Sequence, residues 1–315
     1  MNKDILNILY CFDNNYTKQA LTSIHSLLEN LQESINIFII FNKDDLLQNI
    51  PDKIIKHKNL NNLNIYKFND TNHNFPNISN AHISEATYYR MFISNYIPRE
   101  INYIIYVDAD MIFIKDPIET INKFIQKLND TKFIFGARTD QKISEGIELD
   151  KFERLNLNKS YFNAGFLIIN FKKWNQENFT SKLLQKMYEL NNNILHWDQD
   201  VMNSTVNGEY LEIDEKLNFN SMKLTKNSEI PFVIHYIGSK KPWFTSGLFN
   251  FSSNFYHENY KSIFDNFYHI EHKWKLASLK EVFFSFLNLK VFKLTHPLMF
   301  VIEFVLSLFK KRNKY

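Results

Sequence analysis

Apolar runs alternate with helix-length stretches along the first part of the chain. Residues 5–12, 35–41 and 63–68 are predicted strands. Residues 17–31 are a predicted helix, because turn-forming residues precede a helical pattern, and residues 44–56 are a second predicted helix. Strands that alternate with helices indicate an α/β fold with a mostly parallel sheet.

The alternation continues towards the carboxyl terminus. A polar loop at 73–79 precedes a helix that begins at Ser84 and carries Arg90. The charged segment 142–159 is expected to be irregular and mobile. The remaining predicted elements are helices at 118–128 and 171–190, strands at 132–137 and 161–170, and a short strand from 233 that runs into a Gly-Lys-Pro loop.

Residues 103–113 combine a β-branched and aromatic run, two carboxylates one residue apart and a second apolar run. We predict a buried strand that presents Asp108 and Asp110 at its carboxyl end, where ligands of open α/β sheets gather. Side chains alternate along an extended chain, so both carboxylates share one face. Two carboxylates so placed can clamp a divalent cation. The alternative is an Asp-rich turn without a ligand.

The 315 residues have the composition of a globular protein, with 44% hydrophobic, 16% aromatic and 23% charged residues. The net charge is only +3 and the basic residues are dispersed, which argues against a nucleic-acid partner. Cys11 is the only cysteine, so no internal disulfide can form, which fits a reducing compartment. The apolar stretch at the amino terminus is too short for a signal peptide, and we expect a cytoplasmic protein.

We expect a catalytic domain over residues 1–250, because no linker rich in Gly, Pro or Ser interrupts it, followed by an aromatic and basic helical region over 251–315. Residues 298–309 are apolar nearly all round but fall short of the roughly 20 residues that span a bilayer. With the basic end at 310–314, they predict a helix that lies on a membrane surface. Packing of this helix on the catalytic domain is the alternative.

Several motifs follow one another in a fixed order: Asp-Ala-Asp, Phe-Asn-Ala-Gly, Trp-Asp-Gln-Asp and His-Tyr-Ile-Gly-Ser-Lys-Lys-Pro-Trp. With Phe-Asp-Asn-Asn-Tyr after the first strand and the helix His-Ile-Ser-Glu-Ala-Thr-Tyr-Tyr-Arg, they resemble glycosyltransferase family 8 across residues 5–250. The chain looks most like the bacterial lipopolysaccharide galactosyl- and glucosyltransferases of that family. The resemblance implies a GT-A fold, which is a three-layer α/β/α arrangement with a mixed, mostly parallel sheet. It also implies a UDP-sugar donor, Mn(II) and retention of anomeric configuration.

By this resemblance, Asp108 and Asp110 are metal residues and His235 is the third protein ligand. Two carboxylates with one imidazole suit Mn(II) better than Mg(II), which favours oxygen and water ligands. Lys241 and the Gly238 backbone would contact the diphosphate of the donor. A structural histidine and a solvated surface lysine are the alternative interpretations of His235 and Lys241.

The resemblance also places the donor against residues from several motifs. Asp13 and Asn15 match positions that hold uracil and ribose, although by spacing alone this turn is an ordinary helix cap. Cys11 stands beside the nucleotide where the family has a small Ala. Arg90 would bridge phosphate and carboxylate, unless it is a salt-bridge residue of the helix surface. Further residues placed at the donor are Ala109, Asp140, Asn163, Ala164, Asp198 and Gln199.

Retention through a covalent intermediate needs a carboxylate beneath the anomeric carbon, whereas Gln199 is an amide. Its oxygen can stabilise a developing oxocarbenium ion, so we favour front-face displacement in which the leaving phosphate helps to deprotonate the acceptor. Asp198 would orient the sugar hydroxyls, and Asp200 would do the same or be structural. A solvated helix start with N-terminal acids is the alternative for both.

We therefore expect a Mn(II)-dependent retaining hexosyltransferase that transfers galactose or glucose from a UDP-sugar to a lipopolysaccharide- or lipooligosaccharide-type glycan. A lipid-linked oligosaccharide acceptor would make the enzyme a peripheral protein on the cytoplasmic face of the inner membrane. The alternative is a non-catalytic glycan-binding protein of the membrane surface, against which the intact metal residues argue. A nucleotidyltransferase is disfavoured, because no Gly-rich phosphate loop follows the first strand.

Overall fold

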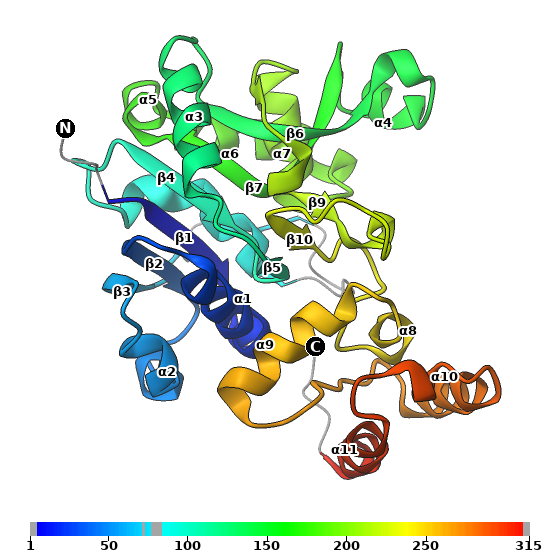
Figure 1. The fold of residues 1–315 in the computed structure, drawn as a ribbon. Helices are drawn as coiled ribbons and strands as arrows, with labels where there is room; N and C mark the ends of the chain where they lie inside the picture. The colour runs from blue at the N-terminus through cyan, green and yellow to red at the C-terminus, as the bar shows by residue number, and fades with distance from the viewer. Residues whose placement is uncertain (1–4, 71–72, 77–83, 311–315) are drawn as a thin grey trace.

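The computed structural model describes residues 5–70, 73–76 and 84–310. The strands of its central sheet are β1 (Asn7–Phe12), β2 (Ile35–Phe41), β3 (Leu60–Lys67), β4 (Tyr103–Val107), β6 (Phe135–Lys142), β7 (Ser160–Asn170) and β8 (Leu211–Glu212). Their order is β3-β2-β1-β4-β7-β6-β8 (Figure 1). β7 is antiparallel to both of its neighbours, and all other pairs are parallel. The mixed, mostly parallel sheet predicted from the sequence is confirmed.

Both faces of the sheet are buried, because alternate strand residues point into two separate hydrophobic cores. In β1, Leu9 lies in one core, while Ile8 and Tyr10 lie in the other. The first core is covered by η3 (Glu85–Asn95), α5 (Phe171–Gln176), α6 (Phe179–Leu190) and α7 (Trp197–Val206), and the second by α1 (Thr17–Asn30) and α3 (Ile118–Asn129). The result is a three-layer α/β/α architecture.

Residues 44–56, predicted as one helix, form η2 (Leu46–Asn49) and α2 (Asp52–Ile55) instead. Pro51 separates the two elements, because it has no backbone N–H and disfavours a helical conformation in the residue before it. Ile50 is accordingly extended, with φ −81° and ψ 122°.

Residues 171–190, also predicted as one helix, divide into α5 and α6. Asn178 between them takes a left-handed φ of 50°, which interrupts a right-handed helix. The segment 142–159, expected to be irregular, contains η4 (Ile143–Glu145) and α4 (Leu149–Arg154). The predicted strand at 132–137 begins later, at Phe135, and runs on to Lys142.

A second sheet changes the interpretation of residues 103–113. It consists of β5 (Met111–Phe113), β10 (Val233–His235) and β9 (Phe219–Asn220). The apolar run is therefore two strands in two sheets, and the chain crosses from β4 to β5 through residues 108–110. Because β5 pairs antiparallel with β10, His235 lies opposite Met111 and next to the acidic crossing.

Short helices form the carboxyl-terminal region (Figure 1). They are α8 (Thr245–Leu248), α9 (Ser253–Phe264), α10 (Lys275–Leu287), η8 (Val291–Lys293) and α11 (Pro297–Phe309). α9 packs on α1, where His25 Nδ1 and Asn259 Oδ1 are 3.4 Å apart. α10 and α11 enclose a small core of their own around Tyr268 and Phe300. The helix predicted at 298–309 is confirmed as α11, with one side in this core.

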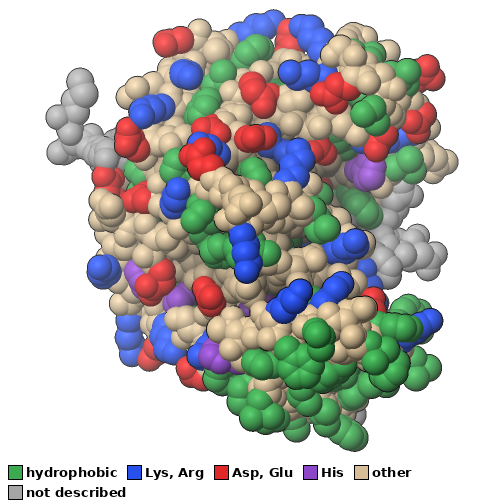
Figure 2. Space-filling view, turned by 45° about the vertical axis from the view of Figure 1, so that its right-hand side comes forward, with side chains coloured by type: hydrophobic (Ala, Val, Ile, Leu, Met, Phe, Trp, Pro, Cys, Tyr) green, Lys and Arg blue, Asp and Glu red, His purple; other side chains and the backbone are tan. Residues whose placement is uncertain are grey.

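Exposed hydrophobic side chains lie on α10, on α11 and on the residues that flank and connect them, and we call this surface the apolar face. It consists of Trp274, Leu276, Leu279, Phe283, Phe284, Leu287, Leu289, Phe292, Leu298, Ile302, Val305, Leu306 and Phe309. Figure 2 shows hydrophobic side chains gathered over this part of the molecule, with basic side chains along the border. No helix in the described part of the chain is both long and apolar enough to cross a membrane. Most of the predicted basic end, residues 311–314, lies outside the described residues.

Candidate active site

A cavity of about 660 Å³ lies at the carboxyl ends of β1 and β4, and we call it the strand-end cavity. Because the two strands are parallel neighbours, Asp13 and Asp108, which follow them, face one space. The first turn of α7 and the loop after β10 form other walls. The predicted site residues that line it are Cys11, Asp13, Arg90, Asp108, Ala109, Asp110, Asp140, Asn163, Asp198, Gln199, His235, Gly238 and Lys241.

Asp108, Asp110 and His235 bring three ligand atoms together in the wall of this cavity. One such atom from each residue lies within 4.8 Å of the other two. His235 Nε2 is 3.2 Å from Asp110 Oδ1 and 3.9 Å from Asp108 Oδ2. The crossing between the two sheets supplies both carboxylates, and β10 supplies the imidazole.

Each carboxylate uses its other oxygen for contacts within the protein. Asp108 Oδ1 accepts hydrogen bonds from Tyr106 Oη at 2.6 Å and Arg90 Nη2 at 3.1 Å. Asp110 Oδ2 forms an ion pair with Lys241 Nζ, while its Oδ1 is buried and accepts no hydrogen bond from another described residue. Asp108 Oδ2 and Asp110 Oδ1 are therefore the oxygens oriented towards His235.

A chain of hydrogen bonds determines which nitrogen of His235 faces the carboxylates. The backbone N–H of Gly165 can only donate, so the Asn163 oxygen 3.0 Å away accepts. That oxygen also accepts from Asn218 Nδ2 at 2.9 Å, which turns the Asn218 oxygen towards His235 Nδ1, 2.8 Å away. Nδ1 therefore carries a proton, and Nε2 is the ring nitrogen that faces the two carboxylates.

Gly165 allows the imidazole to approach β7 closely. A Cβ atom at this position would lie 2.3 Å from His235 Cε1 and 2.9 Å from Asp108 Oδ2, well inside van der Waals contact. The Phe-Asn-Ala-Gly motif lies within β7, as predicted for the strand at 161–170. The side chains of His235 and Asp108 both approach the backbone of β7 at Gly165.

The three open atoms fit a divalent cation. Two carboxylate oxygens and one imidazole nitrogen converge, an arrangement that a divalent cation stabilises. Two oxygens and one nitrogen form a donor set that Mn(II) accepts, whereas Mg(II) favours oxygen and water. The residues present thus fit the metal that the resemblance implies.

Arg90 connects Asp108, one of the three candidate metal ligands, to Asp198 in the first turn of α7. It is only 5% exposed, unlike the surface salt-bridge residue of the alternative interpretation. Its Nε lies 2.7 Å from Asp198 Oδ2, and its Nη1 donates to the Ala164 carbonyl at 2.5 Å. The guanidinium lies 4.0 Å from the centre of the Tyr106 ring, an arrangement that stabilises a buried cation.

Two buried acids of the site, Asp110 and Asp198, differ in how easily they are protonated. Burial opposes the charge on Asp110, but Lys241 and His235 outweigh it and hold the pKa of Asp110 well below its usual range. Burial raises the pKa of Asp198 to about 6, although the charge of Arg90 opposes this shift. Asp198 is therefore the more easily protonated of the two.

Gln199 lies in the first turn of α7, after Trp197, whose left-handed φ of 47° is uncommon for a bulky residue. The Ala164 N–H donates to Gln199 Oε1 at 3.0 Å, which identifies that atom as the oxygen. Nε2 donates to Tyr161 Oη at 3.0 Å. The amide is thus oriented at both ends, and one lone pair of Oε1 remains unused.

Asp200 is fully enclosed and already saturated with donors. Its Oδ2 accepts from the backbone N–H groups of Leu195 and His196 at 2.8 and 2.9 Å and from Arg154 at 2.9 Å. Its Oδ1 accepts from Tyr161 Oη at 2.7 Å. Of the two interpretations of this acid, the contacts favour the structural one, which holds the start of α7.

The remaining predicted residues are more dispersed. Asp13 caps η1 (Asn14–Tyr16), because its Oδ1 accepts from the Asn15 N–H at 2.9 Å. Asn15 itself lines a different cavity, between α1 and the carboxyl-terminal region. Asp140 lies 2.6 Å from Arg138. Gly238 has a left-handed φ of 78°, which a side chain would disfavour.

Three residues that orient the site were not identified from the sequence. Tyr106 stands two positions before Asp108 on the same strand face, and the period of two could have revealed it. Asn218 and Tyr161 reach the site only through contacts between distant segments. No local pattern in the sequence marks them.

We expect replacement of Asn218 with Leu to weaken metal binding roughly 10- to 100-fold, because the proton and ring orientation of His235 would no longer be determined. The measurement is the Mn(II) concentration needed for UDP to raise the melting temperature. Asn170→Leu is the control, since Asn170 is also buried but caps α5 at the other end of β7. Equal Mn(II) requirements in both variants would contradict the role of Asn218.

Comparison with known proteins agrees with this geometry. The model of glycosyl transferase family 8 matches residues 7–247. The lipopolysaccharide glucosyltransferase WaaO of Escherichia coli is 29% identical over 259 residues, which are 76% of this chain and 72% of that protein. The lipopolysaccharide 1,3-galactosyltransferase of Salmonella typhimurium is 30% identical over 187 residues, 54% of this chain and 52% of its own length.

The fold has solved counterparts as well. The crystal structure of the galactosyltransferase LgtC in complex with donor and acceptor sugar analogs matches with a TM-score of 0.66 at 21% identity, covering 82% of this chain and 96% of that one. The family match spans most of the chain and includes all residues that line the strand-end cavity except Lys273. The chain therefore belongs to glycosyl transferase family 8 and has the GT-A fold.

Proposed function

We propose that this protein is a Mn(II)-dependent retaining hexosyltransferase that uses UDP-galactose or UDP-glucose and extends a lipopolysaccharide- or lipooligosaccharide-type glycan. The observation that carries the proposal is the convergence of Asp108 Oδ2, Asp110 Oδ1 and His235 Nε2 in the wall of the strand-end cavity. Relatives named as lipopolysaccharide galactosyl- and glucosyltransferases support the choice of sugar and acceptor class.

The donor would occupy the strand-end cavity with its nucleotide near Asp13 and Cys11. Asp108, Asp110 and His235 would hold Mn(II), which when bound supplies Lewis-acid stabilisation of the departing diphosphate. Lys241 would add a second positive charge at the same phosphates, since its ammonium already lies beside Asp110. Arg90 would keep Asp108 and Asp198 in place through its ion pairs with both.

The contacts of the acids support front-face displacement. Asp198 is paired with Arg90, and Asp200 is enclosed by donors, so neither offers an unengaged carboxylate as a nucleophile. The unused lone pair of Gln199 Oε1 would stabilise positive charge at the anomeric carbon. As the bond from that carbon to the phosphate oxygen breaks, the acceptor oxygen forms its bond on the same face, and its proton passes to the leaving phosphate.

The experiment that tests this function is a screen for UDP release from UDP-hexoses. Mn(II), Mg(II) and no metal are compared, first without acceptor and then with truncated core oligosaccharides. We expect turnover with a UDP-hexose, faster with Mn(II) and stimulated by acceptor, and retained configuration in the product. No turnover with any UDP-hexose would favour a glycan-binding protein instead.

The acceptor is proposed to be a lipid-linked oligosaccharide at the cytoplasmic face of the inner membrane. The apolar face supports this proposal, because an exposed hydrophobic surface of this extent marks an interaction site. α10 and α11 would lie along the interface with their outer side chains among the lipid tails, while their inner sides stay in the small core.

We expect Phe309→Asp to reduce sedimentation with lipid vesicles at least tenfold without changing UDP release in solution. Phe309 is 83% exposed on the apolar face, and an aspartate there opposes burial of the helix in lipid. Ile147→Asp is the control, because Ile147 is also exposed, at 59%, but lies just before α4, at the other end of the molecule from α10 and α11 (Figure 1). Equal vesicle binding by both variants would contradict the assignment of the surface.

A further inference from the structure

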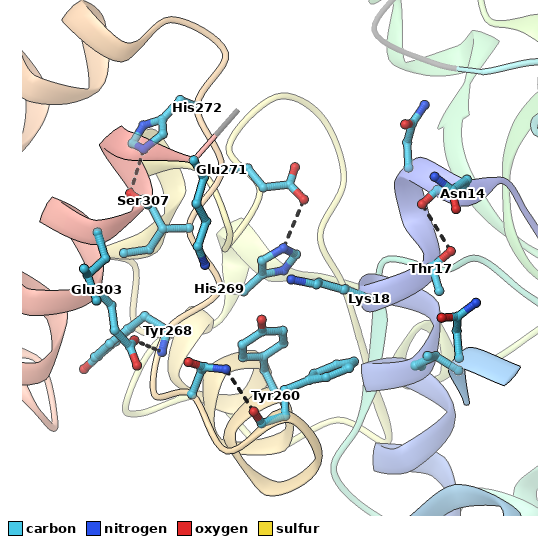
Figure 3. A pocket seen from close by; sticks show the side chains of 18 of the residues that line it. Asn14, Thr17, Lys18, Tyr260, Tyr268, His269, Glu271, His272, Glu303 and Ser307 are labelled. Carbon is cyan, nitrogen blue, oxygen red and sulfur yellow. Dashed lines mark hydrogen bonds and ion pairs between the residues drawn. The ribbon is translucent and has the colours of Figure 1, made fainter. Parts of the chain in front are cut away.

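A second cavity, of about 980 Å³, lies between α1, residues 260–275 and α11, and we call it the helix cavity. Figure 3 shows Lys18 extending from α1 across this space towards His269, with Glu303 on α11 opposite. Lys273 lines both the helix cavity and the strand-end cavity. The helix cavity is therefore adjacent to the strand-end cavity but is lined almost entirely by other residues.

The acidic side chains that line the helix cavity do not neutralise the positive charge of its lysines. Glu303 is already engaged, because it accepts two backbone N–H groups at 2.9 and 2.6 Å. Glu271 accepts from the Gln19 amide at 3.1 Å and lies 3.0 Å from His269 Nε2. Asp45, the third acid, is exposed to solvent.

Four lysines line the same cavity, and two of them have open ammonium groups. Lys275 Nζ donates to backbone carbonyls at the end of α11, and Lys273 lies 4.8 Å from the centre of the Phe244 ring. Lys18 and Lys310 make no side-chain hydrogen bond or ion pair with another described residue. Burial, and then the charge of Lys310, lower the pKa of Lys18, although the charge of Glu271 opposes this shift.

The apolar face continues into the wall of the helix cavity. Trp274 and Leu306 line the cavity and are 68% and 57% exposed as members of that face. A molecule with apolar chains against this face would therefore have its polar end within reach of Lys18 and Lys310. The walls fit an amphipathic anion better than a small ion, which would leave the apolar part of a space this large unfilled.

We propose that the helix cavity binds the phosphate-bearing headgroup of an anionic membrane lipid and so fixes the orientation of the enzyme on the bilayer. The proposal rests on the proposed attachment through the apolar face. It does not depend on the identity of the donor or the acceptor. Lys18 and Lys310 would pair with the lipid phosphate, and Trp274 and Leu306 would contact the glycerol and the first carbons of the chains.

The test compares sedimentation with vesicles of phosphatidylcholine alone and of phosphatidylcholine mixed with phosphatidylglycerol. For the full chain, we expect tighter binding to the mixed vesicles. In each of the variants Lys18→Gln and Lys310→Gln, the affinity for the mixed vesicles should be roughly fivefold lower than in the unsubstituted chain. Lys280→Gln is the matched control, because Lys280 is exposed on α10 beside the apolar face but does not line the helix cavity.

Two further measurements distinguish a lipid site from diffuse attraction to the bilayer and from a site for free phosphate. Short-chain phosphatidylglycerol below its micelle concentration should raise the melting temperature of the full chain but not of Lys18→Gln, whereas inorganic phosphate should not. An equal loss of vesicle binding in Lys280→Gln would indicate diffuse attraction and overturn the proposal, as would an equal thermal shift with inorganic phosphate. UDP release without vesicles should stay unchanged in Lys18→Gln, so the outcome is independent of the catalytic function.

Discussion

Replacing Asp110 with Asn is expected to abolish the Mn(II)-dependent rise in melting temperature caused by UDP and to lower sugar transfer roughly a hundredfold to a thousandfold. Asp110 Oδ1 is the buried oxygen that faces His235, and within the described part of the chain it accepts no hydrogen bond. An amide there is neutral and turns either an oxygen or an NH₂ group towards the metal. The variant also removes the negative partner of Lys241.

Asp116→Asn is the matched control for Asp110→Asn. Asp116 follows β5 and is structural, since its oxygens accept the backbone N–H groups of Gln32 and Ile118 at 3.0 and 2.9 Å. This variant should lower the melting temperature in the absence of ligand but keep the Mn(II) dependence of the UDP effect. A UDP shift that stays Mn(II)-dependent in Asp110→Asn would show that the metal site lies elsewhere.

Gly165→Ala is expected to eliminate metal dependence although Gly165 offers no ligand atom. The added Cβ would collide with the His235 ring at 2.3 Å and with Asp108 Oδ2 at 2.9 Å, so both must move apart. Overpacking of this kind typically costs roughly 1–3 kcal/mol, and the displacement separates the ligand atoms. The expected result is a lower melting temperature together with loss of the Mn(II)-dependent UDP effect.

A double variant distinguishes steric displacement of His235 from general damage to β7. In Gly165→Ala combined with His235→Ala, the ring that the new Cβ meets is absent. We expect the melting temperature to recover towards that of His235→Ala alone, while metal dependence stays lost. Non-additive stability losses of this type identify residues in direct contact. A Gly165→Ala protein with normal Mn(II) dependence would refute the close-approach argument.

Much of the fold follows from local patterns. Apolar patterning is a property of neighbouring residues, and it was sufficient for every strand of the mixed sheet except β8 and for α11. Two segments were wrongly predicted as single helices, because one residue in each interrupts a helical pattern. Pro51 divides residues 44–56 into two elements, and Asn178 separates α5 from α6. Those interruptions depend on backbone conformation rather than on hydrophobicity.

Part of the candidate site could likewise be predicted from neighbouring residues, and part depends on contacts between distant segments. Asp108 and Asp110 are visible in the sequence, because a period of two places both on one face of an extended chain. The continuous apolar run did not reveal that the chain leaves one sheet and joins another between these residues. That crossing brings β10 alongside and puts His235 against the two carboxylates.

Local sequence therefore determined the strands, the acidic pair and, through ordered motifs, the family. The proton position on His235 required the contacts of Gly165, Asn163 and Asn218, which come from β7 and from the segment before β9. The helix cavity likewise exists only because α11 packs back near α1. Such contacts join residues far apart in the chain, and no periodicity encodes them, because they form only when packing brings distant segments together.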